Sequence, residues 1–487
     1  MPLHTYNKSS LFINPRGFTY LLLSVGLFVF AYAIISGNMT IAATIVAIPI
    51  AIIMCISGMQ YPMLSYCIYC AVTLYFSAIY RYTEIEGLSV LYDIFLSICI
   101  ISIAVNTANN RRTDVYLWNA FNILTITQLI WILFALFEQF APYSSFNDIV
   151  RSRGFFTVIP ISYLLSGLLL DSPKKLKATF VLLGVFVITA AMKAYWQKTH
   201  GWDWAETKFL MNYEAWHTHL LQSGARYFSF FSDAGNFGAT MGVLCTTFGI
   251  VSFALRRFWL RWFCIGVAVL AAIGTIMSGT RGAIIIPFCG LFIYILLSKN
   301  LKAILLSIFL GGMAFSLLYF TDIGNGNAFI RRARTAFYPQ EDTSYNVRVE
   351  NRKRFAYYLS DKPFGVGLGN HVVDTQELMK LDEEFIPTDS YWIDIWVENG
   401  IVGLCVHLFL TATVILRCCY VLFFKIHHPQ LRQILAGMLG GVFGLLVNAY
   451  VGRAMGSTPC SLLVPIFLSF VLNGPYIEKQ ISPNYNF

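Results

Sequence analysis

The sequence predicts an all-α protein that is embedded in a membrane as a polytopic bundle of transmembrane helices. Of its 487 residues, 57% are apolar and only 12% are charged, whereas a soluble protein carries about 25% charged residues. Apolar stretches recur from residue 18 to residue 473, and each is long enough to cross a bilayer core of about 30 Å. Because these stretches are continuously apolar and do not alternate, they predict helices and not the strands of a barrel.

About 14 spans are expected, all within one integral membrane domain that comprises residues 1–487. Residues 18–196 are expected to form N-terminal scaffold spans. The polar start MPLHTYNKSSLFINPRGF does not resemble a cleavable signal peptide, so the first span is expected to be retained. The approximate ranges are 18–36, 39–56, 62–80, 88–106, 115–137, 155–170, 176–196, 227–253, 262–279, 282–298, 301–320, 390–416, 432–450 and 457–473.

Lysine and arginine in the short connections predict the orientation, because cytoplasmic loops carry an excess of these residues. The side that holds more of them is expected to be cytoplasmic, and an even number of spans then leaves both termini there. The net charge of +9 therefore reflects topology, and no nucleic-acid partner is expected. The basic residues of this side are Arg111, Arg112, Lys174, Lys175, Lys177, Arg256, Arg257, Arg261, Lys299, Lys302, Arg417, Lys425 and Arg432; the opposite side has Arg81, Arg151, Arg153, Arg281 and Arg453 in its short turns.

Two long connections, 197–226 and 321–389, fall on the outer side. Loops on a rigid scaffold commonly carry function, so the functional residues are sought there. Within the second loop, the segment 346–360 (NVRVENRKRFAYYLS) contains no proline or glycine. It therefore predicts a short helix in which Arg348 and Arg352 share one face.

Three arginines from distant parts of the chain are expected at this outer face. Arg226 precedes a span, Arg281 lies in the tight SGTRG turn between two spans, and Arg348 belongs to the long loop. Guanidinium groups are permanently charged and bind phosphate through a planar fork. The alternative is that these arginines anchor helix ends at the interface, or pair with Asp233 or Glu350.

The stretch TDSYWIDIWVENGIVGL (388–404) is the most specific in the chain. Asp389 and Ser390 stand where a span begins, and Asp394 and Glu398 follow on one helical face. Asp389 is a candidate general base, with Glu398 as an orienting group; the alternative is that Asp389 or Ser390 is a helix N-cap. His371 is a second candidate base. The outer aromatic side chains, including Tyr391, suit either sugar stacking or an interfacial belt.

Other motifs do not predict a cofactor or a metal site. The 11 cysteines lie almost entirely within spans, and Cys67-Ile-Tyr-Cys70 is interpreted as helix packing. The run GVGLG (365–369) lacks a surrounding βαβ unit, so it is expected to form a tight turn or a close backbone approach to a ligand. The sequence contains no zinc motif, P-loop or serine-hydrolase elbow.

Three segments together resemble the O-antigen ligase and O-antigen polymerase (Wzy-like) superfamily of bacterial membrane glycosyltransferases. They are ARYFSFFSDAGNFGA with Arg226, MSGTRGAIIIPFCGLFIYIL, and NVRVENRKRFAYYLSDKPFGVGLGN leading to TDSYWIDIWVENGIVGL. Their order and spacing match, and the resemblance covers residues 220–420, including the extracytoplasmic loop 321–389. It implies a multi-pass protein of the bacterial inner membrane whose active site faces the periplasm.

The resemblance also implies roles for the candidate residues. Arg226 and Arg348 would hold the pyrophosphate of an undecaprenyl-pyrophosphate-linked oligosaccharide, and Arg281 would stabilise the same region. The remaining candidates would bind substrate; they are Arg352, His371, Ser390, Tyr391 and Glu398. Membrane lipid, a chain-length regulator and a flippase are the further partners it suggests.

Ligases of this superfamily carry a His-Asn pair where this chain has Asp389-Ser390, which favours a polymerase of O-antigen, capsule or exopolysaccharide, metal-independent and inverting. The first alternative is an O-antigen ligase that transfers glycan to lipid A core or to protein. The second is a polysaccharide transporter or flippase, which would show ionisable residues near the bilayer midplane and broken spans in matching halves. Asp93 and His407 are isolated in the sequence, and the two halves are unlike.

Overall fold

The structure, a computed structural model, describes residues 60–108, 121–138, 152–368 and 388–481, apart from breaks at 86, 213–214, 222–223, 300, 324–325, 327–329, 332–333 and 335–342. The spans predicted at 18–36 and 39–56 lie outside these residues. Within them the chain is helical, with one short hairpin of β1 (Leu220–Leu221) and β2 (Gly224–Ala225). The all-α prediction is confirmed.

The helices that coincide with predicted spans run in chain order as follows. They are α3 (Pro62–Thr83), α4 (Val90–Ala108), α6 (Ile123–Glu138), α9 (Val158–Leu169), α10 (Pro173–His200), α13 (Ala234–Ala254), α14 (Phe258–Met277), α15 (Arg281–Leu297), α16 (Leu301–Tyr319), α20 (Tyr391–Tyr420), α21 (Pro429–Asn448) and α22 (Cys460–Leu472). Short helices connect them: α8 (Arg153–Phe156), α11 (Trp204–Asn212), α12 (Trp216–His219), α18 (Thr343–Tyr358), η3 (Val421–Lys425), η4 (Ala454–Gly456) and α23 (Gly474–Lys479).

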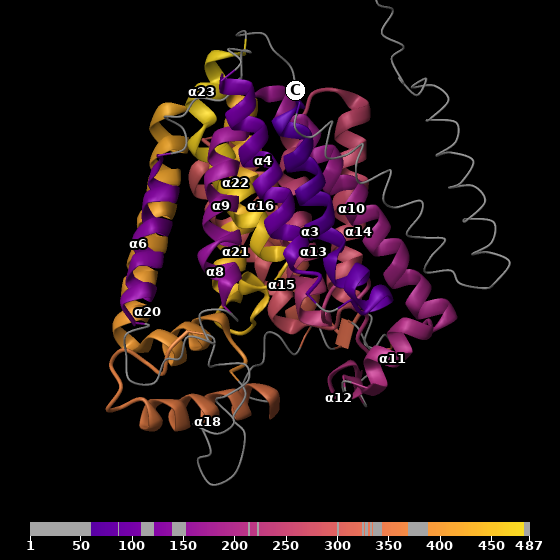
Figure 1. Cartoon of the computed structure of the whole chain (residues 1–487). Coiled ribbons are helices and arrows are strands. Elements are labelled where there is room, and N and C mark those ends of the chain that lie inside the picture. The colour runs from indigo at the N-terminus through magenta and orange to yellow at the C-terminus, as the bar shows by residue number, and fades with distance from the viewer. Residues whose placement is uncertain are drawn as a thin grey trace, which may run out of the picture.

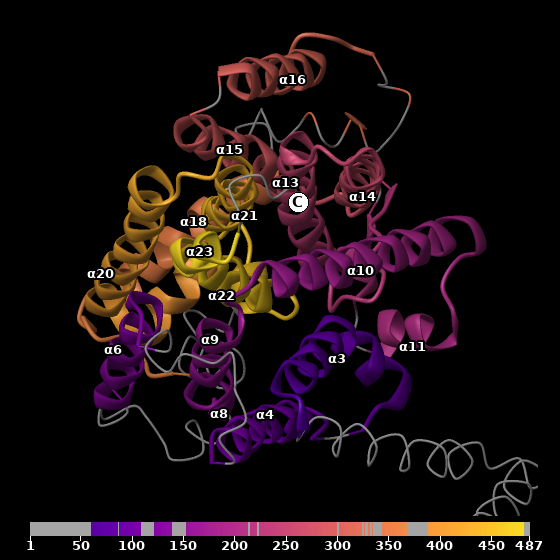
Figure 2. The ribbon, with the colours of Figure 1, turned by 90° about the horizontal axis from the view of Figure 1, so that it is seen from above.

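Seven helices of the described residues are long and apolar enough to cross a membrane, and α6, α15, α16 and α22 are shorter apolar helices. The molecule is therefore a polytopic helical protein, and the total of about 14 spans stays a prediction. Seen from above (Figure 2), α13, α14, α15 and α21 form one group, while α3, α4, α8 and α9 form another. Helices α10 and α22 lie between the two groups.

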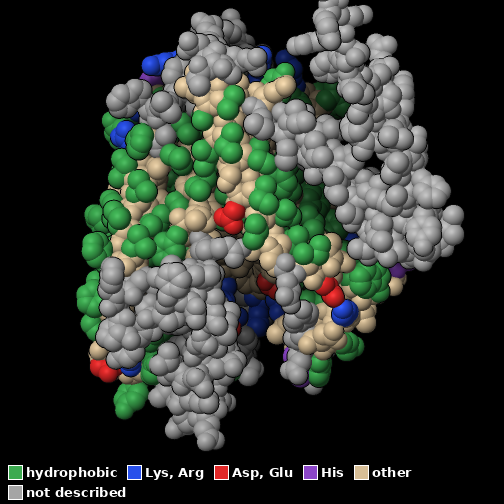
Figure 3. Space-filling view, viewed as in Figure 1, with side chains coloured by type: hydrophobic (Ala, Val, Ile, Leu, Met, Phe, Trp, Pro, Cys, Tyr) green, Lys and Arg blue, Asp and Glu red, His purple; other side chains and the backbone are tan. Residues whose placement is uncertain are grey.

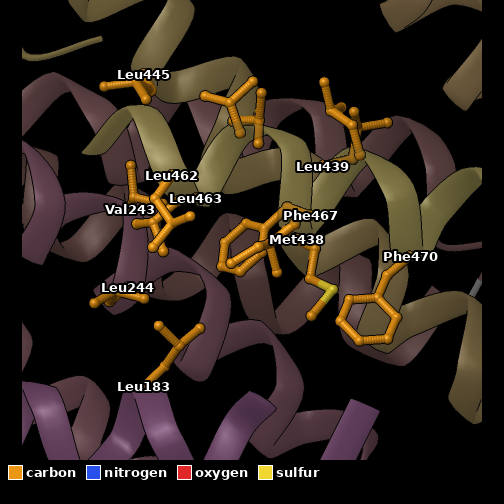
Figure 4. Close-up of a cluster of buried hydrophobic side chains, with 14 of the residues drawn as sticks. Leu183, Val243, Leu244, Met438, Leu439, Leu445, Leu462, Leu463, Phe467 and Phe470 are labelled. Atoms are coloured by element: carbon orange, nitrogen blue, oxygen red, sulfur yellow. The ribbon is translucent and has the colours of Figure 1, made fainter. Parts of the chain in front are cut away.

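The centre of the bundle depends on small residues that let helix backbones approach closely. A Cβ atom on Gly440 of α21 would lie 2.8 Å from the carbonyl oxygen of Gly290 in α15, and one on Gly444 would lie 2.4 Å from that of Ile286. Around this contact, apolar side chains of α13, α21 and α22, such as Val243 and Phe467, interdigitate (Figure 4).

The connections between the helices lie at two opposite ends of the bundle. At one end, Lys299 donates to the carbonyl oxygen of Phe423 at 2.6 Å, and Asn473 donates to that of Leu170 at 2.9 Å. Helix α23 lies at this end, and α18 lies at the opposite end (Figure 1). Which end faces the cytoplasm stays a prediction, as does the side of the two termini.

Helix α20 differs from the continuous span expected at 390–416. Gly400 has φ 65° and ψ −172°, a conformation that is essentially restricted to glycine. The helix therefore bends there, and its first part lies across the lower end of the molecule in Figure 1. The bend separates residues 391–399, which include Asp394 and Glu398, from the part that runs along the bundle.

Candidate functional site

The candidate site lies at the end of the bundle that carries α18. In the space-filling view, Lys and Arg side chains gather inside a hollow at this end (Figure 3). The described elements that meet here are the residues before α13, the α14–α15 turn, α18, the start of α20 and the segment 448–458 after α21. These elements come from distant parts of the chain, and their contacts decide which candidates meet.

Arg226 lies directly against the SGTRG turn. Its Nε donates to the carbonyl oxygen of Ser278 at 3.3 Å, and its Nη2 donates to the hydroxyl of Thr280 at 2.9 Å. The turn itself requires glycine, because Gly279 has a φ of 59°. Arg281, within the turn, is the first residue of α15, so one predicted arginine belongs to the turn and a second, Arg226, binds to it.

The SGTRG turn packs in turn against the end of α21. A Cβ atom on Gly282 would lie 2.8 Å from Nδ2 of Asn448 and 2.7 Å from a methyl group of Val451. A larger residue at position 282 would have to displace one of these side chains. Arg281 is thereby held beside the segment that begins at Asn448.

The start of α20 docks on the same segment. The Ser390 hydroxyl donates to the carbonyl oxygen of Ala449 at 2.9 Å, and the backbone N–H of Tyr391 donates to that of Gly452 at 3.2 Å. Ser390 occupies the N-cap position, but its side chain makes no capping hydrogen bond. The capping interpretation of Ser390 is therefore wrong: this side chain fixes α20 to the end of α21.

Helix α18 completes the arrangement, and the predicted helix at 346–360 is confirmed. Nε of Arg348 lies 3.6 Å from a carboxylate oxygen of Asp389, with both side chains about one-third exposed. Arg352 donates to the carbonyl oxygen of Tyr450 at 2.9 Å, and its guanidinium lies 4.0 Å from the centre of the Tyr450 ring. Arg348 and Arg352 thus face the bundle together.

These contacts link Arg226, Arg281, Arg348, Arg352 and Asp389 through the residues 448–452. Ser390 serves as a structural contact within this set. His371 lies outside the described residues. Tyr391 and Glu398 line a neighbouring cavity, which is described below.

The glycine-rich run packs on the bend of α20. The backbone N–H of Gly367 donates to the carbonyl oxygen of Glu398 at 2.9 Å, and that of Val402 donates to Pro363 at 3.1 Å. A Cβ atom on Gly365 would lie 2.5 Å from the carbonyl oxygen of Glu398. The predicted close backbone approach is confirmed in part, since the partner at Gly365 is α20 of the same chain and not a ligand.

A buried charge network holds the segment that carries Arg226. Arg81 of α3 donates to the carbonyl oxygens of Ser229, at 3.2 Å, and Phe231, and its guanidinium lies 4.5 Å from the centre of the Phe228 ring. Lys193 of α10 lies 2.9 Å from a carboxylate oxygen of the fully buried Glu206. The sequence analysis named Arg81 only as a basic residue of the predicted outer side, because the neighbouring residues in the sequence give no sign of these long-range partners.

His219 supports the same segment as a neutral imidazole. Burial is the main reason that its pKa lies below the usual value, and the charge of Arg226 lowers the pKa further. Its Nδ1 lies 2.8 Å from the carbonyl oxygen of Ala215, and its Nε2 accepts a hydrogen bond from the backbone N–H of Ala234 at 3.3 Å. The first nitrogen therefore carries the proton.

Beside the arginine site, a cavity of about 560 Å³ opens between α4, α6 and α9 on one side and α20 and α22 on the other. Asp394, Glu398, His407 and Arg453 line it, and Nε of Arg453 lies 2.9 Å from a carboxylate oxygen of Asp394. Asp93 lines it as well, so Asp93 and His407, which are isolated in the sequence, border the same cavity. Helical spacing predicted that Asp394 and Glu398 share a face, but it gave no sign of the partner Arg453.

Comparison with known proteins agrees with this arrangement. Residues 266–408 match the model of a family described as O-antigen ligase. The predicted resemblance to this superfamily is confirmed. An O-antigen polymerase of Salmonella muenchen is 23% identical over 256 residues, which make up 50% of this chain and 58% of that protein.

The O-antigen ligase match includes α14, α15, α18 and the start of α20, and therefore Arg281, Arg348, Arg352 and Asp389. Arg226 and the segment 448–458 lie outside it. The aligned region spans somewhat more than half the length of the curated relative. The superfamily resemblance thus contains most of the candidate site, and contacts in the tertiary structure supply the rest.

Proposed function

We propose that this protein is a membrane glycosyltransferase that extends a lipid-linked polysaccharide. In this proposal it transfers a glycan from an undecaprenyl-pyrophosphate donor to a sugar hydroxyl of a second lipid-linked repeat unit, at the periplasmic face of the inner membrane. The observation that carries the proposal is the convergence of Arg226, Arg281, Arg348 and Arg352 with Asp389 around residues 448–452.

The chemistry of the leaving group explains why arginines would be needed. When the bond between the anomeric carbon and the phosphate oxygen breaks, negative charge develops on the pyrophosphate. Fixed guanidinium groups stabilise that charge without a metal ion, and they do so most strongly where little water is present. The N-terminus of α15, at Arg281, adds the positive end of a helix dipole.

Asp389 suits the role of general base. It would accept the proton of the acceptor hydroxyl while that oxygen bonds to the anomeric carbon from the face opposite the pyrophosphate, so the configuration inverts. The gap of 3.6 Å between Arg348 and Asp389 exceeds the length of a direct hydrogen bond. A bound pyrophosphate could therefore engage Arg348 while the carboxylate turns to the hydroxyl.

The first prediction concerns Arg348. We expect Arg348→Ala to lower the rate of product formation by about 100-fold to 1,000-fold, because one group that stabilises transition-state charge is removed. Arg348→Lys should retain part of the rate, since it keeps the charge but not the fork. The rate would be measured with purified protein and a polyprenyl-pyrophosphate oligosaccharide.

Arg354→Ala is the matched control, because Arg354 is an exposed arginine on the same helix. It should retain the rate of the unmodified protein within about twofold, as expected for an exposed charge. A wild-type rate for Arg348→Ala would contradict the assigned role. Product masses distinguish the two transferase functions: a ladder of longer lipid-linked chains indicates a polymerase.

The ligase alternative keeps specific support, because the matching family is described as O-antigen ligase. A ligase would attach finished glycan to lipid A core or to protein, and the products would show glycan on that acceptor and no ladder. The relative named O-antigen polymerase and the Asp389-Ser390 pair favour the polymerase. A chain-length regulator and a flippase belong to this proposal as partners.

A further inference from the structure

The cavity beside the arginine site has no role in the function proposed above. It runs from the outer end of the bundle, at Tyr391 and Arg453, inwards to Val414 and Leu468. Along α22, the distance from Ser461 to Leu468 corresponds to about 10 Å of depth at 1.5 Å per residue. With about 560 Å³ it is within the usual size range of small-ligand pockets.

The character of its wall changes with depth. The outer part contains the carboxylates of Asp394 and Glu398, the guanidinium of Arg453, and the rings of Trp131 and Tyr391. Carboxylates and guanidinium groups hydrogen bond to sugar hydroxyls, and aromatic faces stack on the apolar faces of sugar rings. The outer end therefore suits a saccharide.

The rest of the wall is mostly apolar, although Thr73, Thr127, Gln128, Ser162 and Thr411 also line it. Its lining residues include Leu410, Val414, Ile415, Val464 and Leu468. A mostly apolar cavity between helices suits a hydrocarbon chain. A molecule with sugars at one end and a lipid at the other matches both parts of the cavity.

The number of cationic side chains in the cavity wall indicates whether the cavity suits the donor or the acceptor. Among the residues that line the cavity in the described part of the chain, Arg453 is the one arginine, and it already pairs with Asp394 at 2.9 Å. Arg226, Arg281 and Arg348 do not line it. A donor needs several cations because its pyrophosphate gains charge as it departs. The charge of an acceptor's pyrophosphate stays constant, and Arg453 is the lining cation that would balance part of it.

We infer that this cavity binds the acceptor: its lipid chain lies in the apolar part and its sugars lie along the charged and aromatic outer part. The outer part ends at Tyr391, two residues from Asp389 in the chain, so a bound acceptor would lead towards the proposed base. The inference rests on the proposed function. It assigns the two substrates to two adjacent sites, separated by the residues 448–453.

The test uses two substrate analogues that separate donor from acceptor. In the first analogue the accepting hydroxyl is methylated, so this molecule can only donate its glycan. In the second, a methylene diphosphonate replaces the pyrophosphate and is joined to the anomeric carbon by a carbon bond that cannot be cleaved. This molecule can therefore only accept. We expect Thr411→Trp to raise the KM of the acceptor by about tenfold or more, because the larger side chain would fill space that the lipid chain occupies. Losing the burial of only two methylene groups already weakens binding by about tenfold. The KM of the donor should stay unchanged.

Thr413→Trp is the matched control, because Thr413 stands two residues along the same helix and does not line the cavity. It should leave both KM values unchanged. An acceptor in which a methyl group replaces the lipid chain should be used equally well by both variants, because it has no chain to enter the apolar part. If Thr411→Trp instead raises the KM of the donor, or affects neither substrate, the inference is wrong.

A second measurement uses the unmodified protein and needs no catalysis. The acceptor analogue would carry a diazirine in its lipid chain, and labelled peptides would be mapped after irradiation, with and without excess unlabelled analogue. Competed labels on α6, α20 and α22 support the inference. Labels confined to α13–α15, or no competed label, overturn it. If the unmodified protein forms no product from any donor and acceptor pair, the proposed function is wrong. The labelled positions still show whether the acceptor analogue binds in the cavity.

Discussion

At the residue scale, the candidate site consists of charged side chains whose local sequence gives little sign of their partners. Arg348 faces Asp389 at 3.6 Å across 41 positions of sequence, and Arg226 contacts Thr280 at 2.9 Å across 54 positions. Residue types predicted that the arginines would gather at one face. They did not predict that Ser390 would donate to Ala449, because an N-cap position normally suggests a local hydrogen bond.

The prediction at this scale concerns Asp389. We expect Asp389→Asn to lower kcat by about 100-fold to 10,000-fold, because an amide cannot accept the proton of the acceptor hydroxyl. Asp361→Asn is the control, since the Asp361 side chain is about 75% exposed on the same outer connection. The measurement is the initial rate at saturating substrate. A kcat for Asp389→Asn equal to that of the control would assign Asp389 a structural role only.

At the scale of elements, glycine positions decide how the segments at the α18 end meet the bundle. Segment 363–368 lies on the bend of α20, and the two backbones touch at Gly365 and Gly400. The helix α18 could be predicted because its sequence lacks helix breakers. The bend could not, because Gly400 in an apolar stretch also fits a straight helix, and only the approach of Pro363 requires its φ of 65°.

We therefore expect Gly400→Ala to release the segment 363–368 from α20. The new Cβ would lie 2.0 Å from the carbonyl oxygen of Pro363, and the backbone conformation alone costs about 1–3 kcal/mol for a residue other than glycine. Limited chymotrypsin digestion should cleave after Phe364, an exposed residue of this segment, faster than in the unmodified protein. Gly249→Ala in α13, where a Cβ meets nothing within 4 Å, should leave the cleavage rate unchanged; equal rates in both variants would contradict this account.

At the scale of the whole molecule, the close packing of α13, α15 and α21 sets the position of the site. The α14–α15 turn and the end of α21 meet at Gly282 because these helices pack closely along their length. The hydrophobic effect does not drive helices together inside a membrane, so small residues and close packing must do so. The glycines of α21 therefore influence the geometry of the site, although they are not part of it.

The corresponding prediction is that Gly444→Val lowers thermal stability. Its side chain would collide with the backbone of Ile286, 2.4 Å from the first added carbon, and such overpacking costs about 1–3 kcal/mol or more. The melting temperature in detergent should fall clearly. Gly312→Val in α16 should not lower it, because a Cβ there meets nothing within 4 Å. Similar melting temperatures for the two variants would contradict the role of this contact.

The sequence by itself determined the membrane class, most of the helices and the end of the bundle at which the charged residues gather. These features follow from local composition, since apolar length specifies a span and lysine and arginine mark its ends. Only the tertiary structure decided that Arg453 pairs with Asp394, that Arg81 holds the segment before α13, and that a cavity adjoins the arginines. Such contacts depend on how closely the glycines let the helices approach one another, and the hydropathy of the sequence does not predict that distance.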